Sequence, residues 1–378
     1  MKETCKADPG RAKQRVGFQG DWTKYPGNPV YTVSPPGEWD SGSVTCFNVK
    51  RADSLYWMWY SASGHPGGEP TSVIGVATSE DGVQWQRHPD PILTPGPRGS
   101  WDQHMVGNPE GLYDEGIFKL WYIGRDTVSG TNGIGYATSQ DGFQWTKHGT
   151  SPVITEPSGV GCLAVVRDGD SLYTWYMSQG LNRASSTDGI VWHKYPGNPV
   201  FIPDTTNENA WDSWAVVAPS VVVQGGVYHL WYTGAYEESS GHRGQIQIGH
   251  ATSTDKGITW MRDPDNPVLW APTQEWWEGK SAYSESVVMG PTLAQMWYTS
   301  GGSFGYAWKA LGERKGDVNG DGKVNVLDVV LAVNIILGLF EPTSSQFWAA
   351  DFNDDGVVNI VDVILIVNEI LDGGENND

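Results

Sequence analysis

Two short stretches near the C-terminus carry oxygen-bearing side chains at a spacing suited to a hard metal ion. In residues 317–328 and again in 351–362, such side chains stand at positions 1, 3, 5, 9 and 12, and glycine stands at position 6. Ca²⁺ takes roughly six to eight oxygen ligands on a flexible loop, and glycine permits the sharp turn. Counting the carbonyl of position 7, the predicted ligands are Asp317, Asn319, Asp321, Lys323, Asn325 and Asp328, and Asp351, Asn353, Asp355, Val357, Asn359 and Asp362.

Each of these loops is expected to lead into a helix, over residues 329–337 and 363–371. Position 12 is Asp rather than Glu, and no helix can enter the first loop through the glycines at 312 and 316. Over residues 316–372 the sequence therefore resembles a type I dockerin. The resemblance implies folding around two Ca²⁺ ions and pairing with a cohesin module of a scaffoldin or cell-surface protein.

Positions 10 and 11 of each loop usually help to select the cohesin in that family. Here they are Val326-Leu327 and Ile360-Val361, so the familiar Ser-Thr pair is missing. Apolar pairs on exposed helix starts indicate a protein contact. The alternative is that they pack against the preceding domain.

The rest of the chain is organised by a repeat. A Trp-Tyr pair inside an alternating aromatic run predicts a strand, and a Trp-acid pair lies 20 residues before it in four of the five copies. The third copy has Thr155-Glu156 instead. The Trp-Tyr pairs are Trp59-Tyr60, Trp121-Tyr122, Trp175-Tyr176, Trp231-Tyr232 and Trp297-Tyr298.

After each Trp-Tyr pair of the first, second and fourth copies comes a third strand and then a turn such as Asp81-Gly82. Four short strands per copy predict propeller blades. The last copy lacks a fourth strand, whereas residues 22–31 nearly duplicate residues 192–201. We therefore expect an all-β five-bladed propeller over 20–312, closed by the N-terminal strand 22–31. A tail over 1–19 precedes it, and the small α-helical dockerin with an acidic tail follows over 313–378.

The blade motifs and Asn-Pro-Val stretches resemble glycoside hydrolase families 43 and 32 and their relatives. That resemblance implies hydrolysis by carboxyl groups on the innermost strands. The matching position lies seven residues after the Trp of the Trp-acid pair. It is occupied by Cys46, Asn108, Cys162, Ala218 and Ser284, so the family's acids do not carry over.

Three other acids are the catalytic candidates: Asp40, Glu110 and Glu285. Asp40 belongs to a set that recurs in every blade, which favours a blade-building hydrogen-bond acceptor. Glu110 and Glu285 are taken as non-repeated acids. Strand alternation keeps Glu110 on the face of the family position and turns Glu285 away, unless a bulge intervenes.

Polar and aromatic neighbours supply the candidate carbohydrate contacts. His104, Asn108 and Tyr283 lie near the expected inner strands, and Trp214, Trp270 and Trp276 fall outside the repeated Trp positions. Trp214 and Trp276 are the preferred sugar platforms. Cys46 and Cys162 occupy equivalent positions; we interpret them as small buried hydrophobes, since a redox or metal role lacks supporting histidines.

Composition narrows the function classes. The formal charge of −20 argues against nucleic-acid binding, and no apolar run is long enough to cross a membrane. Three cysteines do not make a disulfide framework. The first 21 residues show no apolar core of a signal peptide, whereas dockerins act outside the cell, so we expect a secreted or surface-attached protein.

Three functions remain open. The first is a glycoside hydrolase-like propeller that acts on or binds poly- or oligosaccharide, tethered by the dockerin. The second is a non-catalytic propeller that binds glycan or protein, and the third is an extracellular structural component.

Overall fold

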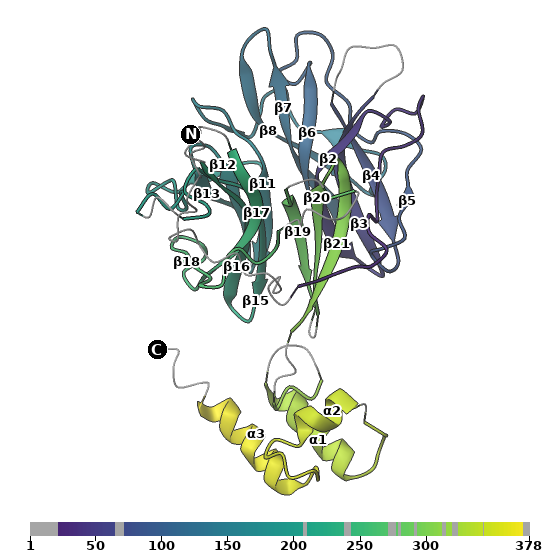
Figure 1. Ribbon diagram of the computed structural model, residues 1–378, viewed down its shortest axis with the longest axis vertical. Helices are drawn as coiled ribbons and strands as arrows, with labels where there is room; N and C mark the ends of the chain where they lie inside the picture. The colour runs from purple at the N-terminus through teal and green to yellow at the C-terminus, as the bar shows by residue number, and fades with distance from the viewer. Residues whose placement is uncertain are drawn as a thin grey trace, which may run out of the picture.

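The computed structural model describes residues 22–64, 72–206, 210–237, 243–270, 277–278, 281–290, 293–311, 315–319, 324–342 and 344–372. They form five antiparallel sheets, followed by three helices in a separate lobe (Figure 1). The predicted fold class, a five-bladed β-propeller with a small helical C-terminal region, is confirmed. The predicted tail 1–19 lies outside the described residues.

The blades follow one another along the chain. Blade one contains β2 (Ser43–Ala52), β3 (Leu55–Ser63), β4 (Val73–Ser79) and β5 (Gln86–Arg87). Blade two contains β6 (Met105–Asp114), β7 (Ile117–Asp126), β8 (Thr131–Ser139) and β9 (Thr146–Lys147), with β10 (Ile154–Thr155) also paired to β8. Blade three contains β11 (Leu163–Asp168), β12 (Ser171–Met177), β13 (Leu181–Ser186) and β14 (His193–Lys194). Blade four contains β15 (Ala215–Gln224), β16 (Val227–Glu237), β17 (Arg243–Ser253) and β18 (Met261–Arg262).

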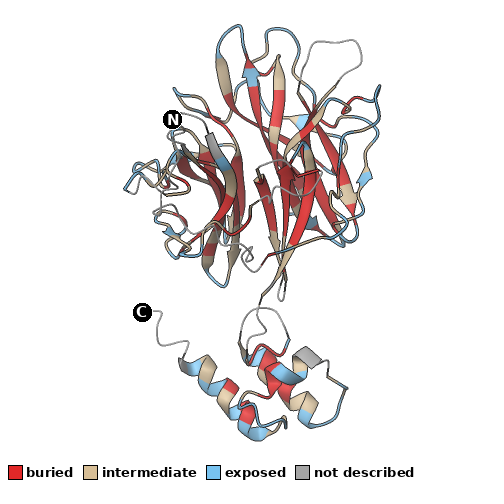
Figure 2. Cartoon of the chain, in the orientation of Figure 1, coloured by how far each residue is buried: buried red, intermediate tan, exposed pale blue. Residues whose placement is uncertain are grey.

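Blade five joins the two ends of the propeller. It combines β19 (Tyr283–Met289), β20 (Leu293–Ser300) and β21 (Ser303–Ala310) with the N-terminal β1 (Thr23–Lys24), which pairs antiparallel with β21. A bridge between Tyr31 and Phe304 extends this pairing. The first strands of the blades, β2, β6, β11, β15 and β19, contact one another in a closed ring and are largely buried (Figure 2). Because β1 pairs with β21, the two ends of the propeller are joined and neither strand exposes an unpaired edge to the other.

The 20-residue spacing of the sequence motifs has a direct structural cause. In blade two, the Tyr122 hydroxyl donates to Asp102 Oδ2 at 3.1 Å, and Lys147 Nζ lies 2.5 Å from the same oxygen. The acid therefore links the second strand of its blade to the fourth. The same three-residue clamp recurs as Tyr60–Asp40–Arg87, Tyr176–Glu156–Lys194, Tyr232–Asp212–Arg262 and Tyr298–Glu278–Lys24.

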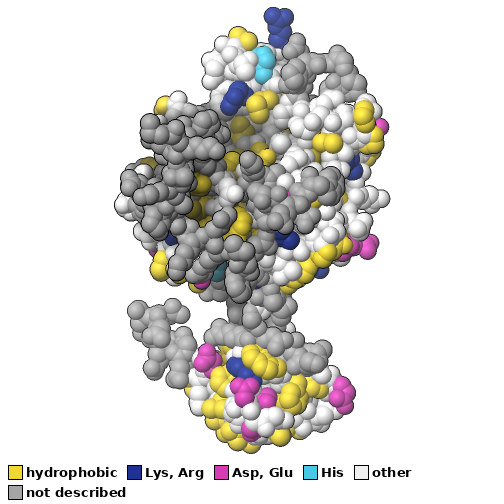
Figure 3. All heavy atoms as spheres, viewed as in Figure 1, with side chains coloured by type: hydrophobic (Ala, Val, Ile, Leu, Met, Phe, Trp, Pro, Cys, Tyr) yellow, Lys and Arg dark blue, Asp and Glu magenta, His cyan; other side chains and the backbone are white. Residues whose placement is uncertain are grey.

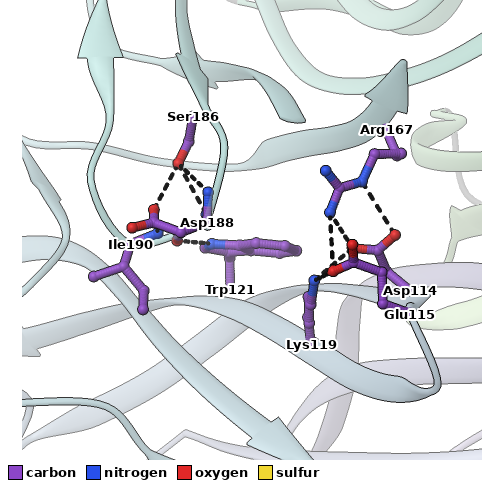
Figure 4. Close-up of polar contacts among 9 residues, drawn as sticks. Asp114, Glu115, Lys119, Trp121, Arg167, Ser186, Asp188 and Ile190 are labelled. Atoms are coloured by element: carbon purple, nitrogen blue, oxygen red, sulfur yellow. Dashed lines mark hydrogen bonds and ion pairs between the residues drawn. The ribbon is translucent and has the colours of Figure 1, made fainter. Parts of the chain in front are cut away.

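The Asp-Gly turns fasten neighbouring blades together. In blade three, Ser186 Oγ donates to Asp188 Oδ1, which in turn accepts the backbone N–H of Ile190 at 2.8 Å (Figure 4). Trp121 of blade two then donates its indole N–H to the Gly189 carbonyl at 2.8 Å. Trp175 and Trp297 make the same bond to Gly257 and Gly82. Trp121, Trp175 and Trp297 thus each join two neighbouring blades.

The helical lobe contains α1 (Val326–Ile336), α2 (Ser344–Ala350) and α3 (Ile360–Asp372). The first and last helices begin three residues before their predicted starts, because Asn325 and Asn359 accept the N–H groups of Leu327 and Val361 and so act as caps. The prediction of two helices missed α2. Among the described helices, none is long and apolar enough to cross a membrane.

Candidate functional site

A small cavity lies where the five inner strands converge. Its volume is about 30 Å³, which is room for one or two water molecules and far below the size of a usual ligand pocket. All five residues at the positions matching the family's acids line it. The lining comprises Cys46, Phe47, Asn48, Asn108, Pro109, Glu110, Cys162, Leu163, Ala218, Pro219, Ser220, Ser284 and Glu285.

A β-bulge at the same place in four blades shapes this cavity. The pairing registers shift at residues 45–47, 107–110, 217–220 and 283–286. At each shift one non-glycine residue adopts a left-handed backbone: Cys46, Asn108, Ala218 and Ser284 have φ between 40° and 49°. Such strain is uncommon outside glycine, and its repetition marks a constrained part of the fold. A bulge also resets strand alternation.

Because of the bulge, Glu285 reaches the cavity wall although simple alternation turns it away. Thr233 Oγ1 donates to Glu285 Oε2 at 3.0 Å, while Oε1 is buried with no hydrogen-bond partner among the described residues. Burial raises the pKa of Glu285 to about 8. At neutral pH this side chain is therefore mostly a carboxylic acid that can donate a proton.

Glu110 is held between blades instead. Its Oε1 accepts the backbone N–H of Val165 in β11 at 3.1 Å and lies 3.1 Å from Lys50 Nζ in β2. Burial raises the pKa of Glu110, opposed by the Lys50 charge and the bond from Val165. The carboxylate thus bridges three consecutive blades.

The position of Glu110 proves to be a repeated one. Asn48 accepts from the Gly111 N–H, Ser220 from Val287 and Ser286 from Val49, each across to the next blade at 2.8–3.1 Å. These acceptors, like Glu110, stand nine residues after the Trp of the Trp-acid pair or its equivalent. Ala164 stands there in blade three. The polar residue at one offset in four copies was the sequence signal for this inter-blade link.

The structure also places the remaining candidates. Asp40 is fully buried in the clamp of blade one, bonded to Tyr60 and paired with Arg87 at 2.8 Å. His104 lies away from the cavity and pairs with Asp126 at 2.9 Å. Asn108 lines the cavity, and its amide donates to Cys162 Sγ at 3.3 Å.

The aromatic candidates are dispersed. Burial raises the pKa of Tyr283, which directly precedes Ser284 at the bulge of β19. Trp214 has 42% of its surface exposed just before β15, as a sugar platform requires. Trp270 is half-buried, and Trp276 lies outside the described residues.

The second calcium loop is described throughout. Asp351 accepts the N–H groups of Asp355 and Gly356 at 3.0 and 2.9 Å. Asp362 accepts those of Asn353 and Asn359 at 3.2 and 2.9 Å. Hydrogen bonds from the loop backbone to the first and last carboxylates therefore hold the loop in a compact turn. The predicted ligands of this loop lie on that turn, and their carboxylate, amide and carbonyl oxygens are the donors that Ca²⁺ prefers.

The first loop has the same frame. Asp328 accepts the N–H groups of Asn319 and Asn325, both at 2.9 Å. Asp321 and Lys323 lie outside the described residues. Within the part of the chain that is described, neither loop gathers three acidic, histidine or cysteine side chains into a metal-ready group.

The apolar pairs at positions 10 and 11 are open to solvent. Val326 and Leu327 have 66% and 60% of their surface exposed, and Ile360 and Val361 have 62% and 48%. They do not pack against the propeller. Figure 3 shows apolar side chains gathered over the helical lobe beside acidic ones.

Comparison with known proteins finds separate relatives for the helical lobe and for the propeller. Residues 315–371 match the family model of the dockerin type I domain. An uncharacterized protein from Mycobacterium tuberculosis is 27% identical over 165 residues, which are 41% of this chain and 54% of that protein. The chain thus spans about half the length of this curated relative.

A shorter match is to an A type blood N-acetyl-alpha-D-galactosamine deacetylase from Flavonifractor plautii. It is 35% identical over 65 residues, covering 15% of this chain and 8% of that enzyme.

Solved structures share the propeller. A glycosyl hydrolase from Bacteroides ovatus has a TM-score of 0.64 at 18% identity, covering 76% of this chain and 93% of that one. A second solved structure comes from the GH130 family of mannoside phosphorylases, which contains glycoside hydrolases that target beta-1,2 mannosidic linkages in Candida mannan. Its TM-score is 0.63 at 19% identity. It covers 78% of this chain and 94% of that chain. The chain is a five-bladed propeller with glycoside hydrolase-like structural neighbours, joined to a type I dockerin domain.

Proposed function

We propose that the propeller is a carbohydrate-binding module anchored outside the cell through calcium-dependent pairing of its dockerin with a cohesin. The carbohydrate class is supported by the structural neighbours, which are described as glycoside hydrolases. The match to the dockerin type I domain supports the partner class and an extracellular location.

One observation favours binding over hydrolysis. Four bulge residues and the matching residue of blade three surround the axis, and none of them is a carboxylate. They are Cys46, Asn108, Ala218 and Ser284, with Cys162 in blade three. Hydrolysis by the usual route needs one carboxyl group as acid and another as base or nucleophile. Glu110 is engaged by Lys50 and Val165, and Asp40 is engaged in its clamp.

Hydrolysis is the second candidate, and Glu285 is the observation in its favour. A carboxyl group with a pKa of about 8 and one oxygen that has no hydrogen-bond partner among the described residues is suited to protonate a leaving group. Glu110 would then have to leave Lys50 to act as its counterpart.

The dockerin takes two Ca²⁺ ions in this proposal. The first would be held by Asp317, Asn319, Asp321, the Lys323 carbonyl, Asn325 and Asp328, and the second by the corresponding residues from Asp351 to Asp362. When bound, Ca²⁺ would stabilise the loops through these ligands. The exposed pairs that open α1 and α3 would form the apolar contact for the cohesin.

A glycan array tests the carbohydrate part. Full-length protein should bind a subset of glycans, and Trp214→Ala should weaken that binding about tenfold, as expected for loss of an aromatic anchor. Trp348→Ala, at a similarly exposed tryptophan of α2, is the matched control and should leave binding unchanged. Absence of binding to any glycan would remove the carbohydrate proposal.

A further inference from the structure

The segment that leads into the helical lobe contacts the second calcium loop, although it precedes the first. Lys315 stands two residues before Asp317, the first predicted ligand of the first loop. Its ammonium group donates to the backbone carbonyl of Trp348 at 2.8 Å and to that of Asp351, the first predicted ligand of the second loop. It also lies 2.5 Å from Asp354 Oδ1. One side chain therefore ties the start of the lobe to the backbone on which the second loop begins.

We propose that Lys315 is a positioning residue for the second calcium loop and makes it the tighter of the two calcium sites. A lysine ammonium only donates hydrogen bonds, whereas Ca²⁺ takes oxygen ligands, so Lys315 itself does not hold the ion. Its effect is on the loop backbone that carries the predicted ligands Asp351, Asn353 and Asp355. This role rests on the calcium binding proposed above and is independent of what the propeller binds.

The contacts of Lys315 fall on the first turn of the second loop. Within that turn, the Asp351 carboxylate accepts the N–H groups of Asp355 and Gly356. Asp354 has a left-handed backbone with φ of 58°, which is uncommon outside glycine. Lys315 binds the carbonyl of Asp351 and the carboxylate of Asp354, so it holds the same turn from outside the loop. A contact that stabilises the binding conformation of a loop raises its apparent affinity, because less of the binding free energy is needed to close it.

Lys315 is itself held in place. Only 19% of its side chain is exposed, and its Nζ lies 4.4 Å from the centre of the Trp348 ring. The next residue, Gly316, donates its backbone N–H to the Ala349 carbonyl at 2.9 Å. An exposed ion pair alone is worth little, but this ammonium group also makes two hydrogen bonds to carbonyls and a cation–π contact. The lysine is thus a fixed part of the surroundings of the second loop.

The repeat provides no counterpart of this contact for the first loop. The two loops lie 34 residues apart, so the residue that corresponds to Lys315 ahead of the second loop is Ala349. The residue that corresponds to Asp354 in the first loop is Gly320. Neither carries a charged side chain. Since the two loops have the same side-chain ligands, Lys315 supplies a difference between them that lies outside the ligand set.

The charge of Lys315 acts against its positioning effect, but weakly. A cation near the loop repels Ca²⁺, whereas the Asp354 carboxylate balances this charge at 2.5 Å. Removal of the lysine alone would leave Asp354 to attract the ion. The side chain of Asp354 is 70% exposed, so salt screens that attraction. We therefore expect the loss of positioning to outweigh the gain in negative charge.

Calcium titration of the full-length protein by isothermal calorimetry, at about 0.15 M ionic strength, tests this role. Asp317→Ala disables the first site and leaves the second to be measured alone, and Asp351→Ala does the reverse. Lys315→Met should weaken calcium binding about tenfold in the Asp317→Ala protein, as expected for loss of a residue that orients metal ligands. In the Asp351→Ala protein it should change binding by no more than about twofold. Equal weakening of both sites, or unchanged binding at the second, would overturn the proposal.

Two further variants separate position from charge. Lys315→Arg keeps the charge and the hydrogen-bond donors and should retain most of the affinity of the second site. Lys315→Met combined with Asp354→Asn leaves the net charge unchanged and should lose at least as much affinity as Lys315→Met alone. Recovery of the affinity in the double variant would mean that charge sets it, and would contradict the positioning role.

Circular dichroism at saturating Ca²⁺ checks that each variant folds. Should a single-site protein not fold, the isotherm of the protein with both sites decides, with two unequal steps expected in wild type and more nearly equal ones in Lys315→Met. Wild-type protein that binds no calcium would overturn the calcium sites and this role together. Two bound ions whose affinities are unaffected by Lys315→Met would overturn this role alone.

Discussion

The Glu110 carboxylate in β6 accepts the backbone N–H of Val165 in β11 at 3.1 Å, across the boundary between blades two and three. Asn48, Ser220 and Ser286 make the same kind of bond at their own boundaries. An acid that resembles a catalyst in sequence thus occupies a structural position of the repeat.

This relationship predicts how Glu110 variants behave. Glu110→Ala should lower the free energy of unfolding by about 3–5 kcal/mol, because it strands both Lys50 and the Val165 N–H in a buried setting. Glu110→Gln keeps an acceptor for Val165 and should lose less. Ser220→Ala, the matched loss of one neutral acceptor, should cost about 1–3 kcal/mol. Urea unfolding measures all three; equal stability of Glu110→Ala and wild type would contradict the link.

Glu285 predicts a dependence of stability on pH. Its pKa is raised to about 8 in the folded protein, so between about pH 4.5 and 8 the folded state binds more protons than the unfolded state. The contribution of Glu285 is therefore present at low pH and is lost as pH rises through about 8, by a few kcal/mol in total. Glu285→Gln should abolish this component, seen as a flatter plot of unfolding free energy between pH 5 and 8.

The exposed Glu80→Gln is the control for that experiment, and it should reproduce the wild-type slope. If Glu285→Gln also reproduced it, Glu285 would not be a buried acid.

Much of the fold was predictable because it repeats. Five copies of one motif specify five blades, and the similarity of residues 22–31 to 192–201 pointed to the pairing of β1 with β21. The axial side chains were harder to predict, because a bulge resets alternation and nothing local in the sequence marks Cys46 or Ser284 for a left-handed backbone. Simple alternation turned Glu285 away from the axis unless a bulge intervened, and the register shift at 283–286 is such a bulge. The role of Glu110 was visible only when its offset was compared across blades.

The Asp-Gly turn of blade three predicts a local loss of stability. Asp188→Ala removes the acceptor of the Ile190 and Val191 N–H groups, each at 2.8 Å, and so loosens the turn that receives Trp121. The unfolding free energy should fall by about 1–2 kcal/mol. Asp188→Asn keeps the acceptor oxygen and should retain most of it. Thermal unfolding followed by tryptophan fluorescence checks the pair, and equal losses in both variants would be inconsistent with an acceptor role.

Chelation predicts selective unfolding of the dockerin. With EDTA, residues 316–372 should lose helical circular dichroism at 222 nm, since metal binding there is part of the folding free energy. Near-ultraviolet signals from the propeller tryptophans should persist, and added Ca²⁺ should restore the helices. Asp362→Ala should weaken the calcium response, because this carboxylate also folds the second loop. Helices that stayed intact in EDTA would argue against the calcium sites.

The central claim is that the propeller binds carbohydrate without cleaving it. The most direct measurement is the length, by mass spectrometry, of a defined oligosaccharide recovered after prolonged incubation with the immobilised full-length protein. We expect the oligosaccharide to be retained and recovered intact, with the same result for Glu285→Gln. Shortened products that disappear in Glu285→Gln would contradict it and establish hydrolysis.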